Sequence, residues 1–243
     1  AVIKLESIKK VEMIEAGVGY IRLSEFQEKT SRDLEKGLMD LEKQGLRGLI
    51  LDLRNNPGGL LDSSIEVSEK FLEKDKIIVS TKGRIKSQNS EYKSRNKNKH
   101  LDYPLVVLIN GGSASASEIV AGAMQDHKRA IILGTKSFGK GSVQTVVPLS
   151  DGSAARLTTS KYFTPNDRSI HGEGIMPDIV VEYIDPEQEK ETEKKDKDIF
   201  EELVEEKKVE EKKEGKEEPA KKYDNQILSA VDVLKGILIY SKK

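Results

Sequence analysis

Apolar and polar positions along the first part of the chain follow two different periods. Residues 18–23 alternate in polarity, which predicts a strand. Thr30 is expected to cap a helix whose leucines repeat along one stripe and which ends at Gly45. Residues 46–53 form a nearly continuous apolar run, as is typical of a strand buried on both faces. The opening pattern is therefore strand, helix and buried strand.

The same two periods continue toward the C-terminus. Residues 82–100 are polar with little periodicity, so we expect a surface excursion there. Strand–helix alternation with short glycine-rich turns predicts an α/β domain with a largely parallel central sheet flanked by helices. Ligand and catalytic sites in such sheets collect at the carboxyl ends of strands, which directs attention to residues 54–59 and 110–115. The further expected elements are helices at 61–74 and 115–127 and strands at 77–81, 105–109, 130–133, 143–147, 154–159 and 179–183.

Charge divides the chain into parts. Charged residues make up 34% of the chain, and residues 186–222 are almost entirely Glu, Lys and Asp, which indicates a solvated linker with transient helix from its Glu–Lys pairs. The helix beyond the linker is amphipathic, and we expect it to dock on the core or to pair with a second subunit. The expected parts are a linker or cap strand at 1–16, the core domain at 17–185, the charged linker at 186–222 and the amphipathic helix at 223–243.

Composition excludes several classes of function. The net charge is −1, from 41 basic and 42 acidic residues, so a nucleic-acid partner is not favoured. The chain has no cysteine, which rules out disulfides, thiolate metal sites and a cysteine nucleophile. No apolar run is long enough to span a membrane, and the N-terminus is not a signal peptide, so we read the chain as a fragment or a mature form.

Ser115 lies where a predicted strand turns into a predicted helix. The start of a helix offers free backbone N–H groups and the positive end of the helix dipole, which a developing oxyanion needs. Ser115 is therefore a candidate nucleophile. The alternative is that Ser113, Ser115 and Ser117 only cap the helix, and this segment alone does not decide between the two.

Lys140 follows a predicted strand in a segment that nearly spells a phosphate-binding loop. Gly134 and Gly139 have the required spacing, but Gly141 replaces the expected Ser or Thr. Residues 143–148 are rich in β-branched side chains and end in proline, so they do not start the helix that such a loop requires. A nucleotide cofactor is therefore not expected.

A lysine between two glycines has another use. Glycines let neighbouring chain approach closely, so we expect Lys140 in a confined, dry place, where desolvation lowers a lysine pKa to about 7–8 and makes the amine a general base. Gln144 lies four residues on, on the same side of the predicted strand, where it can orient the amine. The chain has three histidines with no evident Asp partner, which disfavours a Ser-His-Asp triad.

The chain contains four motifs in order: Leu51–Leu60, Gly112–Glu118, Phe138–Gln144 and Gly172–Asp178. Together they resemble the C-terminal processing proteases, also called tail-specific proteases. The resemblance implies that Ser115 is the nucleophile, Lys140 its general base and Gln144 the residue that orients the base. It also implies an oxyanion hole from the backbone N–H groups of Ala116 and of a glycine in the first motif, for which we choose Gly58 over Gly59.

The same resemblance implies a crotonase/ClpP-like core, no metal or cofactor, and protein or peptide substrates with accessible C-termini. Family members act outside the cytoplasm, in the periplasm or cell envelope, and normally carry a regulatory PDZ domain. No PDZ domain is recognisable in this sequence, and residues 2–7 resemble the segment that follows one. Two alternatives stay open: a crotonase-like domain acting on an acyl thioester, and a catalytically silent binding domain.

Overall fold

The computed structural model describes residues 6–95, 100–185 and 223–240. Its larger sheet has six strands, of which the first pairs antiparallel with the second and the others run parallel. The carboxyl ends of β3 and β6 lie next to each other, which brings residues 54–59 and 110–115 together. In spatial order the strands are β1 (Ile8–Glu15), β2 (Val18–Leu23), β3 (Gly48–Asp52), β6 (Leu105–Ile109), β7 (Ala130–Gly134) and β10 (Ile179–Val180).

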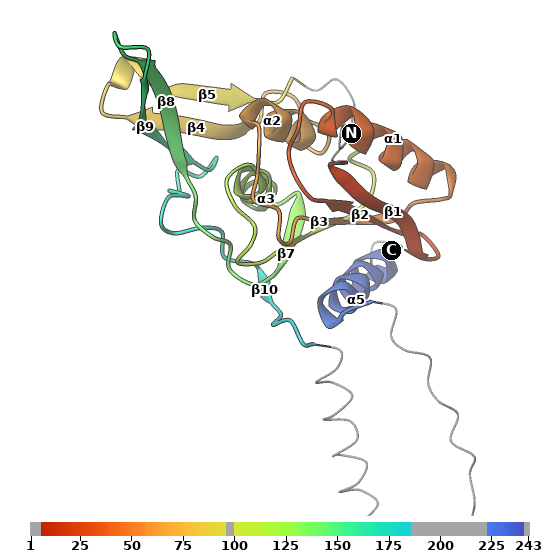
Figure 1. Ribbon diagram of the computed structural model, residues 1–243. Coiled ribbons are helices and arrows are strands. Elements are labelled where there is room, and N and C mark those ends of the chain that lie inside the picture. The colour runs from red at the N-terminus through yellow and green to blue at the C-terminus, as the bar shows by residue number, and fades with distance from the viewer. Residues whose placement is uncertain (1–5, 96–99, 186–222, 241–243) are drawn as a thin grey trace, which may run out of the picture.

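A second, antiparallel sheet extends from one side of the first (Figure 1). Its outer strand β8 begins two residues after Lys140, so the segment that carries this lysine joins the two sheets. The short 3-10 helix η1 (Lys86–Gln88) lies between β4 and β5 in the chain. The strands in spatial order are β5 (Ser90–Lys93), β4 (Ile77–Gly83), β9 (Ala154–Phe163) and β8 (Ser142–Pro148).

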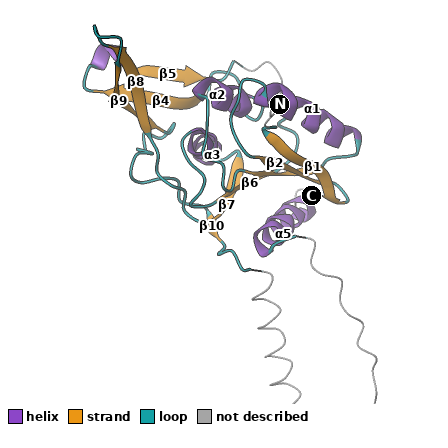
Figure 2. Cartoon of the chain, viewed as in Figure 1, coloured by secondary structure: helices purple, strands orange, loops and turns teal. Residues whose placement is uncertain are grey.

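Helices cover both faces of the larger sheet (Figure 2). Three lie on one face: α1 (Thr30–Lys43), α2 (Leu61–Glu69) and α3 (Ala116–Asp126). The fourth, α5 (Asn225–Tyr240), packs against the opposite face. Successive residues of β3 alternate between the two cores, since Leu49 and Leu51 pack with α1–α3 while Ile50 packs with α5. Burial on both faces explains the continuous apolar run that predicted this strand.

The structure differs from the sequence-based expectations mainly at polar and terminal positions. The predicted surface excursion at 82–100 contains β5, an exposed edge strand without an apolar face to mark it. The helix predicted at 61–74 ends at Glu69, because the chain turns there to bury Phe71 and Leu72. Thr30 is not the N-cap of α1: its hydroxyl accepts a hydrogen bond from the N–H of Gln27, which precedes the helix.

The C-terminal helix docks on its own core. Its apolar stripe, which includes Ile227, Val231 and Leu234, is buried against Tyr20 and Ile50 of the sheet. This stripe is therefore not free to pair with a second subunit. Among the described residues, no helix is long and apolar enough to cross a membrane. The charged linker predicted at 186–222 lies outside the described residues.

We predict that Leu234→Ala lowers the free energy of unfolding by about 2–5 kcal/mol, because it leaves a cavity between α5 and the sheet. Leu234 is 0% exposed. The matched control is Ile239→Ala on the same helix. Its side chain is 69% exposed, so we expect little change in the free energy of unfolding. Denaturant unfolding of both variants tests this, and equal losses would show that α5 is not docked in solution.

Candidate active site

Ser115 occupies a sharp turn between β6 and α3. It is the N-cap of α3 in a capping box with Glu118, and its backbone has a φ of +55°. A positive φ is unusual for a residue other than glycine, and such strained residues collect at functional sites. The side chain is only partly buried. The turn therefore presents the hydroxyl at the carboxyl end of the sheet, beside the N-terminus of a helix.

The hydrogen bonds of the three neighbouring serines separate their roles. Ser113 Oγ donates to the carbonyl of Leu53 at 2.8 Å, and Ser117 Oγ donates to the carbonyl of Asn56 at 2.9 Å. Both hydroxyls are buried and fix the turn after β6 to the turn after β3. The Ser115 hydroxyl donates no hydrogen bond to any residue that the structure describes. Of the three, it alone keeps its proton available for chemistry.

One backbone N–H group at the start of α3 and one in the turn after β3 are also free. Neither Ala116 nor Gly59 donates its N–H to an acceptor within the described part of the chain. The N–H of Gly58, by contrast, donates to the side-chain oxygen of Asn56 at 2.9 Å. The remaining backbone N–H groups of this turn are unavailable. Those of Asn55, Asn56 and Leu60 donate to other acceptors, and Pro57 has no N–H.

This pattern changes the role expected for Gly58. Its N–H already donates to the Asn56 side chain, so it could serve an oxyanion only by giving up that bond. Gly58 instead lets the turn approach the nucleophile. It has a φ of +102°, and a Cβ here would lie 2.8 Å from Ser115 Cβ and 2.9 Å from Ala116 N. Only glycine combines that backbone conformation with so close a contact.

A buried carboxylate joins the serine turn to the lysine segment. Glu118 is 0% exposed. One of its oxygens accepts the N–H groups of Ser115 and Lys140, each at 2.8 Å. The other accepts Ser137 Oγ and the N–H of Gly139, each at 2.6 Å. Glu118 thus fixes the backbones of the two candidate catalytic residues relative to each other.

Lys140 itself is exposed, contrary to the dry place expected from the sequence. Its ammonium group has no hydrogen bond or ion pair with the described residues. The close approach predicted for the flanking glycines is present: Gly139 accepts the N–H of Gly172, and a Cβ on Gly141 would lie 2.3 Å from His171 N. The backbone is confined while the side chain is not, because no described segment covers this side of the site.

The remaining motif residues lie around the lysine segment. Gln144 is exposed on β8 and makes no side-chain hydrogen bond to Lys140. The fourth motif packs against the segment: the N–H of Ile175 donates to Ser137 Oγ at 2.7 Å. Asp178 then accepts the N–H of Ile132 and so attaches this motif to β7. The fourth motif therefore supports the lysine segment.

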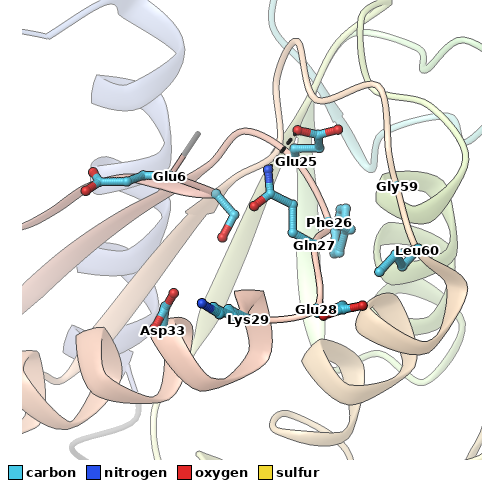
Figure 3. A pocket seen from close by; sticks show the side chains of 10 residues that line it. Glu6, Glu25, Phe26, Gln27, Glu28, Lys29, Asp33, Gly59 and Leu60 are labelled. Carbon is cyan, nitrogen blue, oxygen red and sulfur yellow. Dashed lines mark hydrogen bonds between the residues drawn. The ribbon is translucent and has the colours of Figure 1, made fainter. Parts of the chain in front are cut away.

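A cavity of about 610 Å³ borders the end of the turn at Gly59 and Leu60 (Figure 3). Gly59 and Leu60 form one wall, and Phe26 forms another. A Cβ on Gly59 would collide with Phe26, whereas one on Gly58 would collide with Ser115, so the turn separates the cavity from the nucleophile. Neither Ser115 nor Lys140 lines the cavity.

Sequence reasoning missed two features of this site. Nothing local in the sequence indicates that Glu118 holds Ser137, Gly139 and Lys140. The link from Arg54 to Asp224 was missed as well, because 170 positions separate the partners.

We predict that Gly58→Ala slows any reaction of Ser115 and destabilises the fold, because the added methyl meets backbone atoms at 2.7–2.9 Å. Gly152→Ala is the matched control: Gly152 also has a positive φ, but nothing lies within 4 Å of its added Cβ. Thermal unfolding and labelling by a serine-reactive fluorophosphonate measure both effects. Equal behaviour of the two variants would contradict the contact between Gly58 and Ser115.

Comparison with known proteins identifies the family. Residues 17–181 match Peptidase family S41. A carboxy-terminal-processing protease of Bartonella bacilliformis is 50% identical over 193 residues, which cover 78% of this chain and 44% of that protein. A carboxyl-terminal-processing protease of Synechocystis sp. is 50% identical over 165 residues, which cover 68% of this chain and 38% of that protein. The chain therefore spans less than half the length of these curated relatives.

Solved structures agree. A photosystem II D1 C-terminal processing protease superposes with a TM-score of 0.67 at 35% identity, over 74% of this chain and 49% of that one. A protein described as an S41 protease from Bacteroides fragilis superposes with a TM-score of 0.63 at 18% identity, over 75% of this chain and 52% of that one. At this identity the likeness shows the fold alone. The predicted α/β fold with a ClpP/crotonase-like core is thereby confirmed. Given the match at 17–181 and two relatives at 50% identity, the chain belongs to peptidase family S41.

Proposed function

We propose that this chain forms the catalytic core of a serine endopeptidase that processes protein C-termini, with Ser115 as nucleophile and Lys140 as general base. One observation carries the proposal most strongly. The Ser115 hydroxyl, at the start of α3, donates no hydrogen bond to the described residues, and the N–H of the next residue, Ala116, is also unengaged. A nucleophile beside unengaged backbone donors is the arrangement that acyl transfer requires.

In the proposed reaction, Lys140 in its neutral form takes the Ser115 proton as the hydroxyl attacks a peptide carbonyl. The resulting ammonium then donates its proton to the leaving amine, and water resolves the acyl-enzyme by the same route. The structure supports the motion this needs, because the Lys140 amine has no partner among the described residues while its backbone is held by Glu118. A substrate lying over the exposed amine removes water from it and so favours its neutral form.

The oxyanion is assigned to the N–H groups of Ala116 and Gly59. Gly59 replaces our first choice, Gly58, because the Gly58 N–H would have to give up its bond to Asn56 before it could serve. Gln144 is retained as the residue that orients the amine once a substrate is bound. This role requires a rearrangement, since no hydrogen bond joins Gln144 to Lys140 in the present structure.

The proposed substrate class is supported by the relatives. Two relatives named as C-terminal processing proteases are each 50% identical to the chain over 193 and 165 aligned residues, which favours protein substrates with accessible C-termini. We also propose an extracytoplasmic location, in the periplasm or cell envelope, which rests on the resemblance to the family and on no feature of the structure. The reaction needs no metal or organic cofactor.

We predict that Ser115→Ala and Lys140→Ala each abolish peptide cleavage without loss of the fold, because each removes one partner of the proton transfer. Ser90→Ala and Lys136→Ala are matched controls, since both side chains are exposed and outside the site. Cleavage of a peptide with a free C-terminus, alongside circular dichroism, measures the outcome. Activity retained in either site variant would refute the Ser–Lys pair.

The rate should rise with pH, because only the neutral amine of Lys140 accepts the serine proton. Initial rates at saturating substrate between about pH 6 and pH 9 test this. A flat profile would argue against an amine base. Binding of an acyl thioester without peptide cleavage would favour the crotonase-like alternative.

A further inference from the structure

The side chain of Arg54 connects the catalytic turn to the C-terminal helix. Arg54 is the residue just before the turn at 55–59, and it is only 7% exposed. Its Nε and Nη2 donate to the two carboxylate oxygens of Asp52 at 3.0 and 2.8 Å. Its Nη1 donates to Asp224 Oδ1 at 2.9 Å and to Gln226 Oε1 at 2.7 Å. Two residues at the start of α5 therefore hold the far end of this guanidinium.

The buried charge of Arg54 depends on these partners. Burial lowers the pKa of Arg54, but the hydrogen bonds and charges of Asp52 and Asp224 outweigh it and raise that pKa above its ordinary value. Asp52 is shared, because it also accepts the phenol of Tyr20 at 2.7 Å. Burial and Asp52 both raise the pKa of that phenol. Removing one partner of such a buried group leaves a charge that is no longer compensated.

Asp224 couples the position of Arg54 to the start of the helix. The same Oδ1 that accepts Arg54 also accepts the N–H groups of Gln226 and Ile227, each at 3.0 Å, and so caps α5. Gln226 is 1% exposed, and its amide nitrogen donates to the carbonyl of Val181 at 2.7 Å. The start of α5 is thus tied both to the residue before the catalytic turn and to the end of β10.

The turn that Arg54 precedes is in contact with the nucleophile's own turn. The carbonyl of Asn56 accepts the N–H of Ala114 at 3.0 Å and the hydroxyl of Ser117 at 2.9 Å. Gly58 packs against Ser115, and Gly59 carries the free N–H. A displacement of Arg54 would therefore be transmitted to the oxyanion donors through a few peptide units.

We propose that Asp224 and Gln226 are positioning residues for the catalytic turn, so that α5 is a working part of the active site. The inference rests on the proposed function, because it assumes that the turn supplies an oxyanion donor. Neither residue touches the substrate. Both act through Arg54, which they hold from the face of the sheet opposite α3.

The test is Asp224→Asn in the full chain. Asparagine caps a helix as well as aspartate does, so the start of α5 survives while the charge facing Arg54 is lost. We expect faster amide hydrogen exchange at residues 54–60 and about 10- to 100-fold slower fluorophosphonate labelling of Ser115, because small misplacements of a site cost that much. Asp224→Glu restores the charge and should recover part of the rate.

Asp232→Asn is the matched control, since Asp232 is exposed on the same helix and should change neither measurement. If Asp224→Asn does not fold, Gln226→Met gives the same two measurements with the cap intact. Exchange and labelling equal to those of Asp232→Asn would overturn the proposal. A wild-type chain that neither labels nor cleaves refutes the proposed function instead, while the exchange of the turn still decides whether α5 holds it.

Discussion

The geometry of this site depends on one buried carboxylate. Glu118 has no access to water, and its charge is balanced by four hydrogen bonds and by the N-terminus of α3. Because the donors come from two segments that are distant in the chain, the carboxylate sets the spacing between Ser115 and Lys140. A neutral hydrogen-bond acceptor with one oxygen would not serve all four donors. The arrangement therefore requires an acidic residue at this position of the helix.

The helices and buried strands could be predicted from the sequence because their signals are local. The strand at 105–109 has the predicted bounds, and the helix at 225–240 lies within the predicted 223–243, since a doubly buried strand and an amphipathic helix each carry a strong apolar pattern. The edge strand β5 could not be predicted in this way, because its side chains are largely exposed and its stability comes from pairing with β4. Apolar periodicity reports burial, and it is silent where burial is absent.

For the site, motif order predicts which residues are candidates but not their state. The positions of Ser115 and Ala116 at the start of α3 follow from a strand-to-helix turn. The exposure of Lys140 cannot be derived in this way, because it depends on whether another segment of the protein covers the side chain. The choice between Gly58 and Gly59 required the position of the Asn56 side chain, which no pattern in the sequence specifies. Roles set by contacts between distant segments, as for Arg54 and Asp224, are hidden for the same reason.

The start of α5 has a topological consequence. The N–H of Ile184 donates to the side-chain oxygen of Asn225, whose amide nitrogen donates to the carbonyl of Glu182. Residues 182–184 and Asn225 are therefore held together, although 41 to 43 positions separate the bonded residues. For a flexible chain, the entropy of joining two such points grows only with the logarithm of the number of residues between them, by about 0.6 kcal/mol per doubling. The length of chain between these two points is therefore expected to have little effect on the stability of the core.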